Sequence, residues 1–313
     1  MRRRPFGERD HLTDGVVVAV IFHERACNQA VQVGGDEQDE RHRARRQQKE
    51  LPLKIEPQAH HHNSDESTEG SARWRVEVLV AGDPVRASVV LARRRPREVA
   101  LFDTGLALHE VSLRAALAAR GLAPEDVSMV FNTHAHVDHS HNNSLFARAR
   151  IYCSARDRQW TRALHAALSA TNEADAPELL RFYPDLASGA YDPKIVRKMF
   201  EIERLLWDDA RLGDDRQCAW LEEASLPTGI HAIATPGHVP FHTSFIIDAD
   251  PFPVLVAGDA LLMRDEADAV LQLMPPHDPV AYHRSQLWVL SFHGLIVPGH
   301  DAPFMNPFAT ERP

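Results

Sequence analysis

The run His134-Ala-His136-Val-Asp138-His139 constrains the chain most, because it places four potential metal ligands within six residues. It follows the apolar segment 127–131, which has the length and composition of a buried β-strand. Residues i and i+2 of an extended segment share a face, so the first two histidines can point at one metal ion. The aspartate and the third histidine then turn the chain and can face a second ion. The sequence therefore predicts a metal centre at the end of a strand.

Three further candidate ligands each follow another predicted strand. A glycine directly precedes each of them, which suits a sharp turn that presents a side chain at the edge of a sheet. Scattered histidines would not repeat this arrangement at four strand ends. The three are His238 after the run 230–234, Asp259 after the run 254–257, and His300 after the run 295–297.

This ordered set of ligands resembles the metallo-β-lactamase superfamily, as does the upstream run Leu101-Phe102-Asp103-Thr104-Gly105. The resemblance covers roughly residues 74–305. It implies an α/β fold, a four-layer αβ/βα sandwich with a two-metal site on one edge. It also implies a role for each candidate: His134, His136 and His238 hold the first metal, Asp138, His139 and His300 hold the second, Asp259 bridges both, and Asp103 supports the site without binding metal.

The resemblance implies a metal-dependent hydrolase that uses a hydroxide bridging two divalent ions. We expect zinc, with iron and manganese as the other candidates, since imidazole and carboxylate suit all three. Asp138 lies between the two predicted sites, so we expect it also to relay a proton as a catalytic residue. The expected substrate is a small ester-type molecule, and we favour a lactone over a thioester.

Individual residues distinguish several branches of the superfamily. True β-lactamases lack the bridging aspartate, so Asp259 argues against that activity. Glyoxalase-II-like thioesterases have a C-terminal helical region, whereas this sequence ends soon after His300. Lactonases share the ligand set, carry extra helices between the histidine motif and the next histidine, and can use a tyrosine near the metals. Tyr183 and Tyr191 are the candidates here, although neither can be aligned with the family.

Two alternatives stay open. The segments 121–134 and 297–304 resemble a small stand-alone branch, the metallo-β-lactamase-domain-containing protein 1 type, part of which is associated with RNA cleavage. A phosphodiester nuclease acting on RNA is therefore the first alternative, and an iron-dependent sulfur oxygenase is the second. His141, His242 and His293 lie near the motifs but match no ligand position of the family, so we expect them not to be catalytic.

The chain divides into two unequal parts. Residues 1–72 hold basic and acidic clusters and one short apolar run, so we expect this extension to be disordered. Residues 73–313 form the expected metallo-β-lactamase domain, with a helical insertion at about 155–225 whose apolar side chains pack onto the sandwich, line a substrate pocket or form a homodimer contact. Further strands are expected at 74–80, 87–91, 99–102, 150–153 and 243–248, and further helices at 109–120 and 280–292.

Composition excludes some classes of protein. No run approaches the roughly 18 apolar residues of a membrane helix, so we expect no membrane span. The net charge is −9, which argues against binding nucleic acid through a basic surface and favours a small-molecule substrate. The three cysteines, Cys27, Cys153 and Cys218, are too few and too scattered for a disulfide framework. We therefore expect a reducing, cytoplasmic location.

Overall fold

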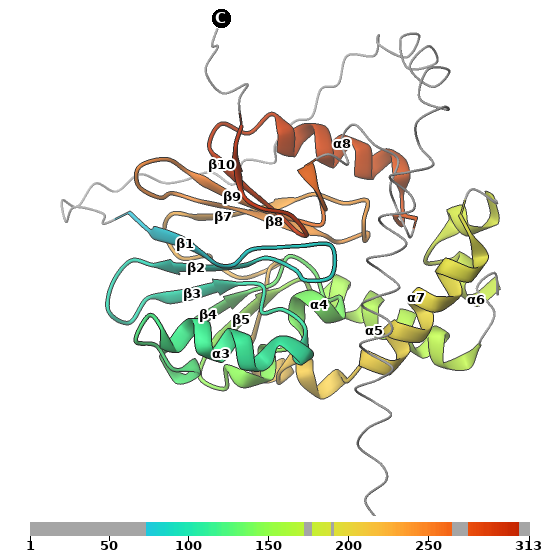
Figure 1. Cartoon of the computed structure of the whole chain (residues 1–313), viewed down its shortest axis with the longest axis horizontal. Coiled ribbons are helices and arrows are strands. Elements are labelled where there is room, and N and C mark those ends of the chain that lie inside the picture. The colour runs from blue at the N-terminus through green and yellow to red at the C-terminus, as the bar shows by residue number, and fades with distance from the viewer. Residues whose placement is uncertain (1–72, 172–176, 189–190, 265–274, 307–313) are drawn as a thin grey trace, which may run out of the picture.

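Two β-sheets face each other in the computed structural model, and helices cover their outer faces (Figure 1). The structure describes residues 73–306, apart from 172–176, 189–190 and 265–274. The expectation for residues 1–72 thus lies outside the described residues. The order of layers is helix, sheet, sheet, helix, so the predicted four-layer αβ/βα sandwich is confirmed.

The first sheet has six described strands in the order β1 to β6. The first three strands pair antiparallel, whereas β3 to β6 run parallel. Helix α3 (Glu110–Ala118) covers its outer face, and the buried Leu113 and Leu117 pack there against apolar strand residues. The strands are β1 (Arg75–Val80), β2 (Val89–Arg93), β3 (Val99–Phe102), β4 (Met129–Phe131), β5 (Arg150–Cys153) and β6 (Cys218–Trp220).

The second sheet contains five described strands in the order β11-β10-β9-β8-β7. Helix α8 (Pro279–Leu290) covers its outer face, with Val289 buried against Leu255 and Ile296. Between the sheets lies the largest apolar core, in which Phe131 stacks on Phe102 with ring centroids 4.8 Å apart. The strands are β7 (Ile230–Ala234), β8 (Thr243–Ile247), β9 (Val254–Gly258), β10 (Leu295–Pro298) and β11 (Phe304–Met305).

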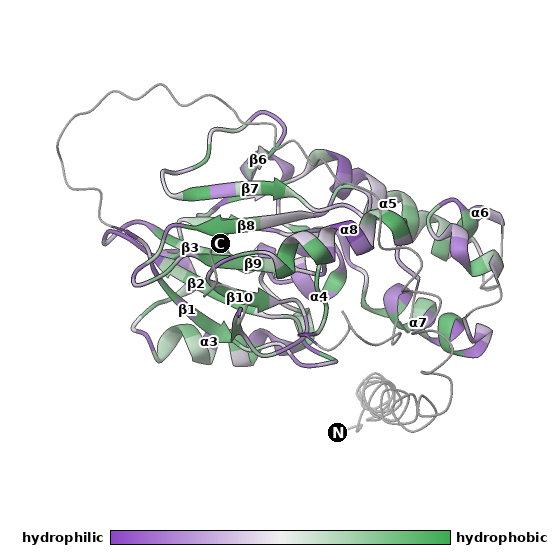
Figure 2. Cartoon of the chain, turned by 90° about the horizontal axis from the view of Figure 1, so that it is seen from above, coloured by the Kyte–Doolittle hydropathy of each residue, from purple (hydrophilic) through white to green (hydrophobic). Residues whose placement is uncertain are grey.

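The insertion consists of α5 (Ala155–Ala170), α6 (Pro177–Leu180) and α7 (Pro193–Leu206). These helices stand to one side of the strands (Figure 2) and share an apolar core of their own. That core contains most of the large apolar side chains of the insertion, among them Leu164, Phe182 and Phe200. The insertion is shorter than expected, because β6 lies within the range 155–225 and pairs with β5 as the edge strand of the first sheet.

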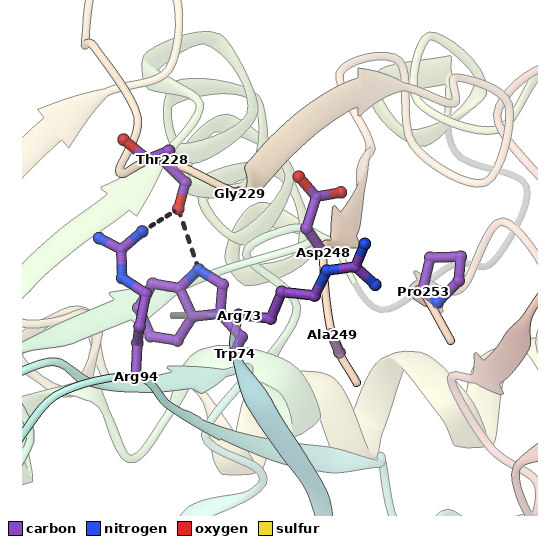
Figure 3. A pocket seen from close by; sticks show the side chains of 8 residues that line it. All are labelled: Arg73, Trp74, Arg94, Thr228, Gly229, Asp248, Ala249 and Pro253. Carbon is purple, nitrogen blue, oxygen red and sulfur yellow. Dashed lines mark hydrogen bonds between the residues drawn. The ribbon is translucent and has the colours of Figure 1, made fainter. Parts of the chain in front are cut away.

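The carboxyl ends of β4, β7, β9 and β10 meet at one edge of the sandwich, where each strand is followed by a predicted ligand. A cavity of about 450 Å³ lies at the other end of the strands (Figure 3). There the side chain of Arg94 and the indole of Trp74 both donate to the carbonyl of Thr228, which ties the two sheets together. Of the helices that the structure describes, none has the length and apolar character needed to span a bilayer.

Candidate metal centre

All seven predicted ligand side chains come together at the strand edge. His134 and His136 follow β4, and α4 (Val137–Ser140) makes the single helical turn that redirects the chain. The side chains gather into three overlapping groups whose donor atoms lie within 4.8 Å of one another. The groups are His134, His136 and His238; His134, His139 and Asp259; and Asp138, His139 and His300.

The first set comprises His134, His136 and His238. The Nδ1 of His136 lies 3.1 Å from the Nε2 of His238, and that Nε2 lies 3.3 Å from the Oδ2 of Asp259. The Nε2 of His134 is 3.9 Å from the same carboxylate oxygen. Three imidazole nitrogens and one carboxylate oxygen therefore converge on one point.

The second set comprises Asp138, His139 and His300. The Nε2 of His300 lies 3.1 Å from the Oδ2 of Asp138, and the Nε2 of His139 lies 3.1 Å from the Oδ1 of Asp259. Asp259 therefore turns one oxygen toward each set. This is the arrangement expected of a carboxylate that bridges two metal ions.

The distances between these nitrogen and oxygen atoms are those expected around a bound metal ion. Donors at 2.0–2.1 Å from a tetrahedral zinc lie about 3.3–3.4 Å from one another. The atoms of the two sets are separated by 3.1–3.9 Å. The Nε2 atoms of His134 and His139 and the Oδ1 of Asp259 are buried without a hydrogen-bond partner among the described residues. Buried polar atoms are rarely left so, and a cation at each set would satisfy them.

Hydrogen bonds outside the two sets fix which nitrogen of His139 faces the centre. Its Nδ1 lies 2.8 Å from the Oδ2 of Asp103, a carboxylate that also accepts hydrogen bonds from the N–H and O–H of Thr133. Since a carboxylate only accepts, the proton of His139 must sit on Nδ1. In the neutral imidazole the Nε2 then carries the lone pair that metal binding requires. Asp103 thus forms hydrogen bonds with both His139 and the residue before His134.

Two more ligands are oriented in the same way. The hydroxyl of Thr133 donates to Asp103, so its oxygen accepts from the Nδ1 of His134 at 3.1 Å. The Nδ1 of His300 donates to the carbonyl of Asp83 at 3.1 Å. In the neutral form of both histidines the Nε2 lone pair then faces the centre.

Two glycines let Asp259 reach its place. Gly258 has φ = 55°, and a Cβ there would lie 2.7 Å from the side chain of Thr133. A Cβ at Gly299 would lie 2.0 Å from the Oδ1 of Asp259. Any larger residue would push the carboxylate or its supporting threonine aside. The sequence associated these glycines with sharp turns. At Gly258 and Gly299, close packing against Thr133 and Asp259 also requires the absence of a side chain.

Burial and charge act differently on the two sets. Burial, reinforced by His238, lowers the pKa of His136 to about 3, so this imidazole is neutral and able to bind metal. Burial alone would also lower the pKa of His300, but the carboxylates of Asp259 and Asp138 outweigh it and raise that pKa to about 9. The second set thus holds protons tightly and must release them to bind a cation.

Two supporting residues escaped the sequence reasoning. His242 was expected not to be catalytic and was given no other role, and its Nε2 accepts a hydrogen bond from the backbone N–H of Asp259 at 3.1 Å. Its Nδ1 then donates to Thr235, which donates to Ser244, whose hydroxyl donates to the carbonyl of Ala257. His242 is therefore not one of the grouped donors, but it anchors Asp259.

Asp157 is the second residue that was missed. From α5 its Oδ2 accepts from the backbone N–H of Ala135 at 2.6 Å, between the two histidines of the motif. Burial raises the pKa of Asp157 to about 7, while this hydrogen bond opposes the shift. The insertion is thereby connected to the ligand loop. No sequence signal marks either residue, because both contacts join distant segments.

The candidate tyrosines occupy the core of the insertion. Tyr183 is buried beside Trp160 and Phe200, with ring centroids 6.1 and 5.9 Å away. Tyr191 packs against the same core. Among the described contacts, neither tyrosine touches a side chain of the two sets. Trp160 does approach one, since its ring centroid lies 6.3 Å from that of His136.

Comparison with known proteins identifies the family of this chain. A family model described as the metallo-beta-lactamase superfamily matches residues 82–300. "Metallo-beta-lactamase domain-containing protein 1" of Mus musculus is 31% identical over 206 residues, which are 65% of this chain and 60% of that protein. The protein of the same name from Xenopus laevis is 26% identical over 226 residues, 72% of this chain and 76% of that protein. This chain therefore spans about 60% of the length of the mouse relative.

Solved structures of low sequence identity are also similar to this chain. A putative metallo-beta-lactamase from Thermotoga maritima is 21% identical with a TM-score of 0.48, covering 74% of this chain and 99% of that one. A quorum-quenching N-acyl homoserine lactone lactonase is 17% identical with a TM-score of 0.47, covering 74% of this chain and 90% of that one. Because the family model matches well over half of its residues, the chain belongs to the metallo-β-lactamase superfamily.

Proposed function

We propose that this protein is a two-metal hydrolase of a small ester-type substrate, with a lactone favoured over a thioester. The observation that carries the proposal is Asp259, whose two carboxylate oxygens face two different sets of histidines. In this proposal the first set holds one divalent ion, the second set holds another, and Asp259 binds both. Membership of a superfamily made up mostly of metal-dependent hydrolases supports the assignment.

Two divalent ions would supply Lewis acidity, which lowers the pKa of water and polarises a carbonyl or phosphoryl oxygen. The protein's own side chains would hold and transfer protons. The Oδ2 of Asp138 lies 3.1 Å from the Nε2 of His300, and a quarter of the Asp138 side chain is exposed to solvent. It is therefore placed to take up a proton from the attacking water and to deliver it to the leaving group.

The neighbourhood of the first set supports an apolar acyl group. The ring of Trp160 lies near the ring of His136. It also lies near the rings of Phe182 and His277, whose centroids are 5.4 and 5.7 Å from its own. The side chain of His238 is 18% exposed, so solvent reaches the first set. An ester whose carbonyl approaches from that direction would place its acyl chain near the indole of Trp160.

The test is hydrolysis by the zinc-loaded full chain, followed as proton release from acyl lactones and acyl thioesters of increasing chain length. Asp259→Asn is the inactive control, since an amide cannot serve as a bridging anion. Glu125→Gln, an exposed carboxyl that belongs to neither set of candidate ligands, is the matched control. We expect lactone turnover that rises with acyl length, is lost in Asp259→Asn and is kept in Glu125→Gln.

Zinc, iron and manganese contents are measured on the same samples. Turnover of neither ester class by protein holding two metal ions would overturn the substrate assignment. Cleavage of single-stranded RNA by that protein would then favour the nuclease. Iron retention with oxygen uptake on a persulfide would favour the sulfur oxygenase. Thioester turnover above lactone turnover would reverse the stated preference.

A further inference from the structure

Cys153 and Cys218 form a thiol pair on neighbouring parallel strands. Cys218 is in register with Ile151, so Cys153, two residues further along β5, lies on the same face of the sheet. The two Sγ atoms are 3.8 Å apart. Cys153 is buried, whereas Cys218 is partly exposed. The pair therefore combines one thiol that solvent can reach with one that it cannot.

A fixed positive charge stands beside Cys218. The Nη1 of Arg158 lies 2.6 Å from its Sγ, and Arg158 itself is buried. The same guanidinium donates to the carbonyls of Leu212 and Gly213 and pairs with Asp215 at 2.9 Å, so it cannot swing away. The hydrogen bond from Cys153, with the charge of Arg158, lowers the pKa of Cys218. The same hydrogen bond, with burial, raises the pKa of Cys153.

We propose that Cys153 and Cys218 are a peroxide-reactive dithiol, in which Cys218 is the attacked thiol and Cys153 resolves it to a disulfide. This site is separate from the metal centre and does not depend on the proposed function. A thiolate that is stabilised by a cation, reachable by solvent and next to a second thiol is the pattern of a redox-sensitive cysteine.

The chemistry balances with one hydroperoxide. The thiolate of Cys218 attacks the terminal oxygen, an S–O bond forms, the O–O bond breaks, and the departing alkoxide or hydroxide takes up a proton. Cys153 then attacks the sulfur of the resulting sulfenic acid, and its proton passes to the departing hydroxide. An S–S bond forms, the S–O bond breaks, and water leaves. Two thiols lose two electrons in total, and the peroxide gains them.

The local structure allows the sulfurs to meet. A disulfide needs them at about 2.05 Å, so they must approach by about 1.8 Å. β6 is an edge strand of only three residues, and a 3-10 turn (Asp215–Gln217) directly precedes it. Such a strand can shift at lower cost than a central one. Ser154, which caps α5, directly follows Cys153, so the cross-link would form beside the helix that carries Asp157.

The test treats the full chain with substoichiometric hydrogen peroxide and maps its peptides by mass spectrometry. We expect loss of two hydrogen atoms and one peptide pair that joins Cys153 to Cys218. Cys27→Ser should give the same cross-link, and Cys153→Ser should stop at a sulfenic acid on Cys218 that a 1,3-dione traps. The matched measurement is the oxidation rate of Cys218 in the native chain against the urea-unfolded chain.

We expect Cys218 to react about tenfold faster when the chain is folded, although folding covers part of it, because only the folded chain places Arg158 beside it. Slower oxidation in the folded chain would overturn the proposal. So would a native chain that is oxidised at Cys27 alone, or one in which Cys218 accumulates as sulfinic acid without joining Cys153. These outcomes come from the unsubstituted chain, so they stand even if Cys153→Ser folds poorly.

Discussion

The Nδ1 of His139 and the Oδ2 of Asp103 lie 2.8 Å apart, and both side chains are buried. Asp103 also accepts two hydrogen bonds from Thr133, directly before the first ligand, and has φ = 54°. A non-glycine residue in the left-handed region is held there by its surroundings at an energetic cost. The carboxylate of Asp103 therefore fixes a proton on the Nδ1 of His139, a candidate ligand of the second set. Through Thr133 it also holds the loop that carries His134 and His136 of the first set.

Asp103→Asn should weaken metal binding more than it weakens the fold. Asparagine has one accepting oxygen and one donating N–H₂ group, so it cannot accept all three of the hydrogen bonds that Thr133 and His139 direct at Asp103. We expect the affinity of the second set for zinc to fall roughly 10–100-fold, in line with the loss of other outer hydrogen bonds at metal sites. Calorimetric titration of the metal-free protein measures this, with Glu125→Gln as control. Unchanged affinity in a folded variant would contradict the assigned role.

Gly299→Ala should displace the carboxylate of Asp259 although none of the candidate ligands is itself substituted. The added Cβ would stand 2.0 Å from the Oδ1 of Asp259. Because Asp259 faces both sets, we expect the zinc content after dialysis to fall at both. Gly121→Ala is the control, since its Cβ would meet no atom within 4 Å and only its φ of 68° adds strain. Two retained zinc ions in Gly299→Ala would show that Asp259 does not bridge.

Two of the strands that lead to candidate ligands, β9 and β10, could be predicted because they are buried along nearly their whole length. β9 and β10 appear in the sequence as short continuous apolar runs, each ended by glycine shortly before a ligand. β6 could not be predicted in this way. Cys218–Trp220 is three residues long with one buried side chain, and its strand conformation comes from pairing with β5 rather than from its own pattern.

The grouping of the seven candidate ligands, and the neighbouring Asp103, could be predicted from the sequence, whereas the supports His242 and Asp157 could not. His134 and His136 share a face because of local geometry, which a sequence displays directly. Asp157 reaches Ala135 across 22 residues, and His242 reaches Asp259 across 17. Each of these contacts exists only after the helix of the insertion, or the turn before β8, has packed against the ligand loop. A buried aspartate or histidine far from the motif has no local signature of that role.

Trp160→Ala should change substrate preference, provided that the proposed ester hydrolysis is correct. Removal of the indole beside His136 deletes apolar surface that an acyl chain would contact. We expect kcat/KM for a long-chain lactone to fall about tenfold relative to a short-chain one, which equals about 1.4 kcal/mol in the transition state. Leu205→Ala, an exposed leucine of α7, is the control. Equal losses for both chain lengths would remove Trp160 from the acyl site.

Glu203→Gln should remove a pH dependence of stability that does not require the metals. The Oε2 of Glu203 is buried 3.5 Å from the Nε2 of His165, whose ring stacks on Trp207 at 3.8 Å. Burial, with a smaller effect of the Asp138 charge, raises the pKa of Glu203 to about 8, while burial lowers the pKa of His165 to about 3. Both shifts favour neutral groups, so this contact is no ion pair near pH 7.

The sign of the effect follows from proton counts. Between about pH 4.5 and pH 8 the folded chain keeps the proton of Glu203 and the unfolded chain has released it, so the free energy of unfolding falls as pH rises. One such group contributes at most about 1.4 kcal/mol per pH unit, and partial exposure of the side chain reduces this.

Urea unfolding of the wild type and Glu203→Gln across this range isolates the difference. Glu201→Gln, an exposed carboxyl on the same helix, should follow the wild type. Parallel curves for wild type and Glu203→Gln would mean that the carboxyl ionises normally and that solvent reaches it freely.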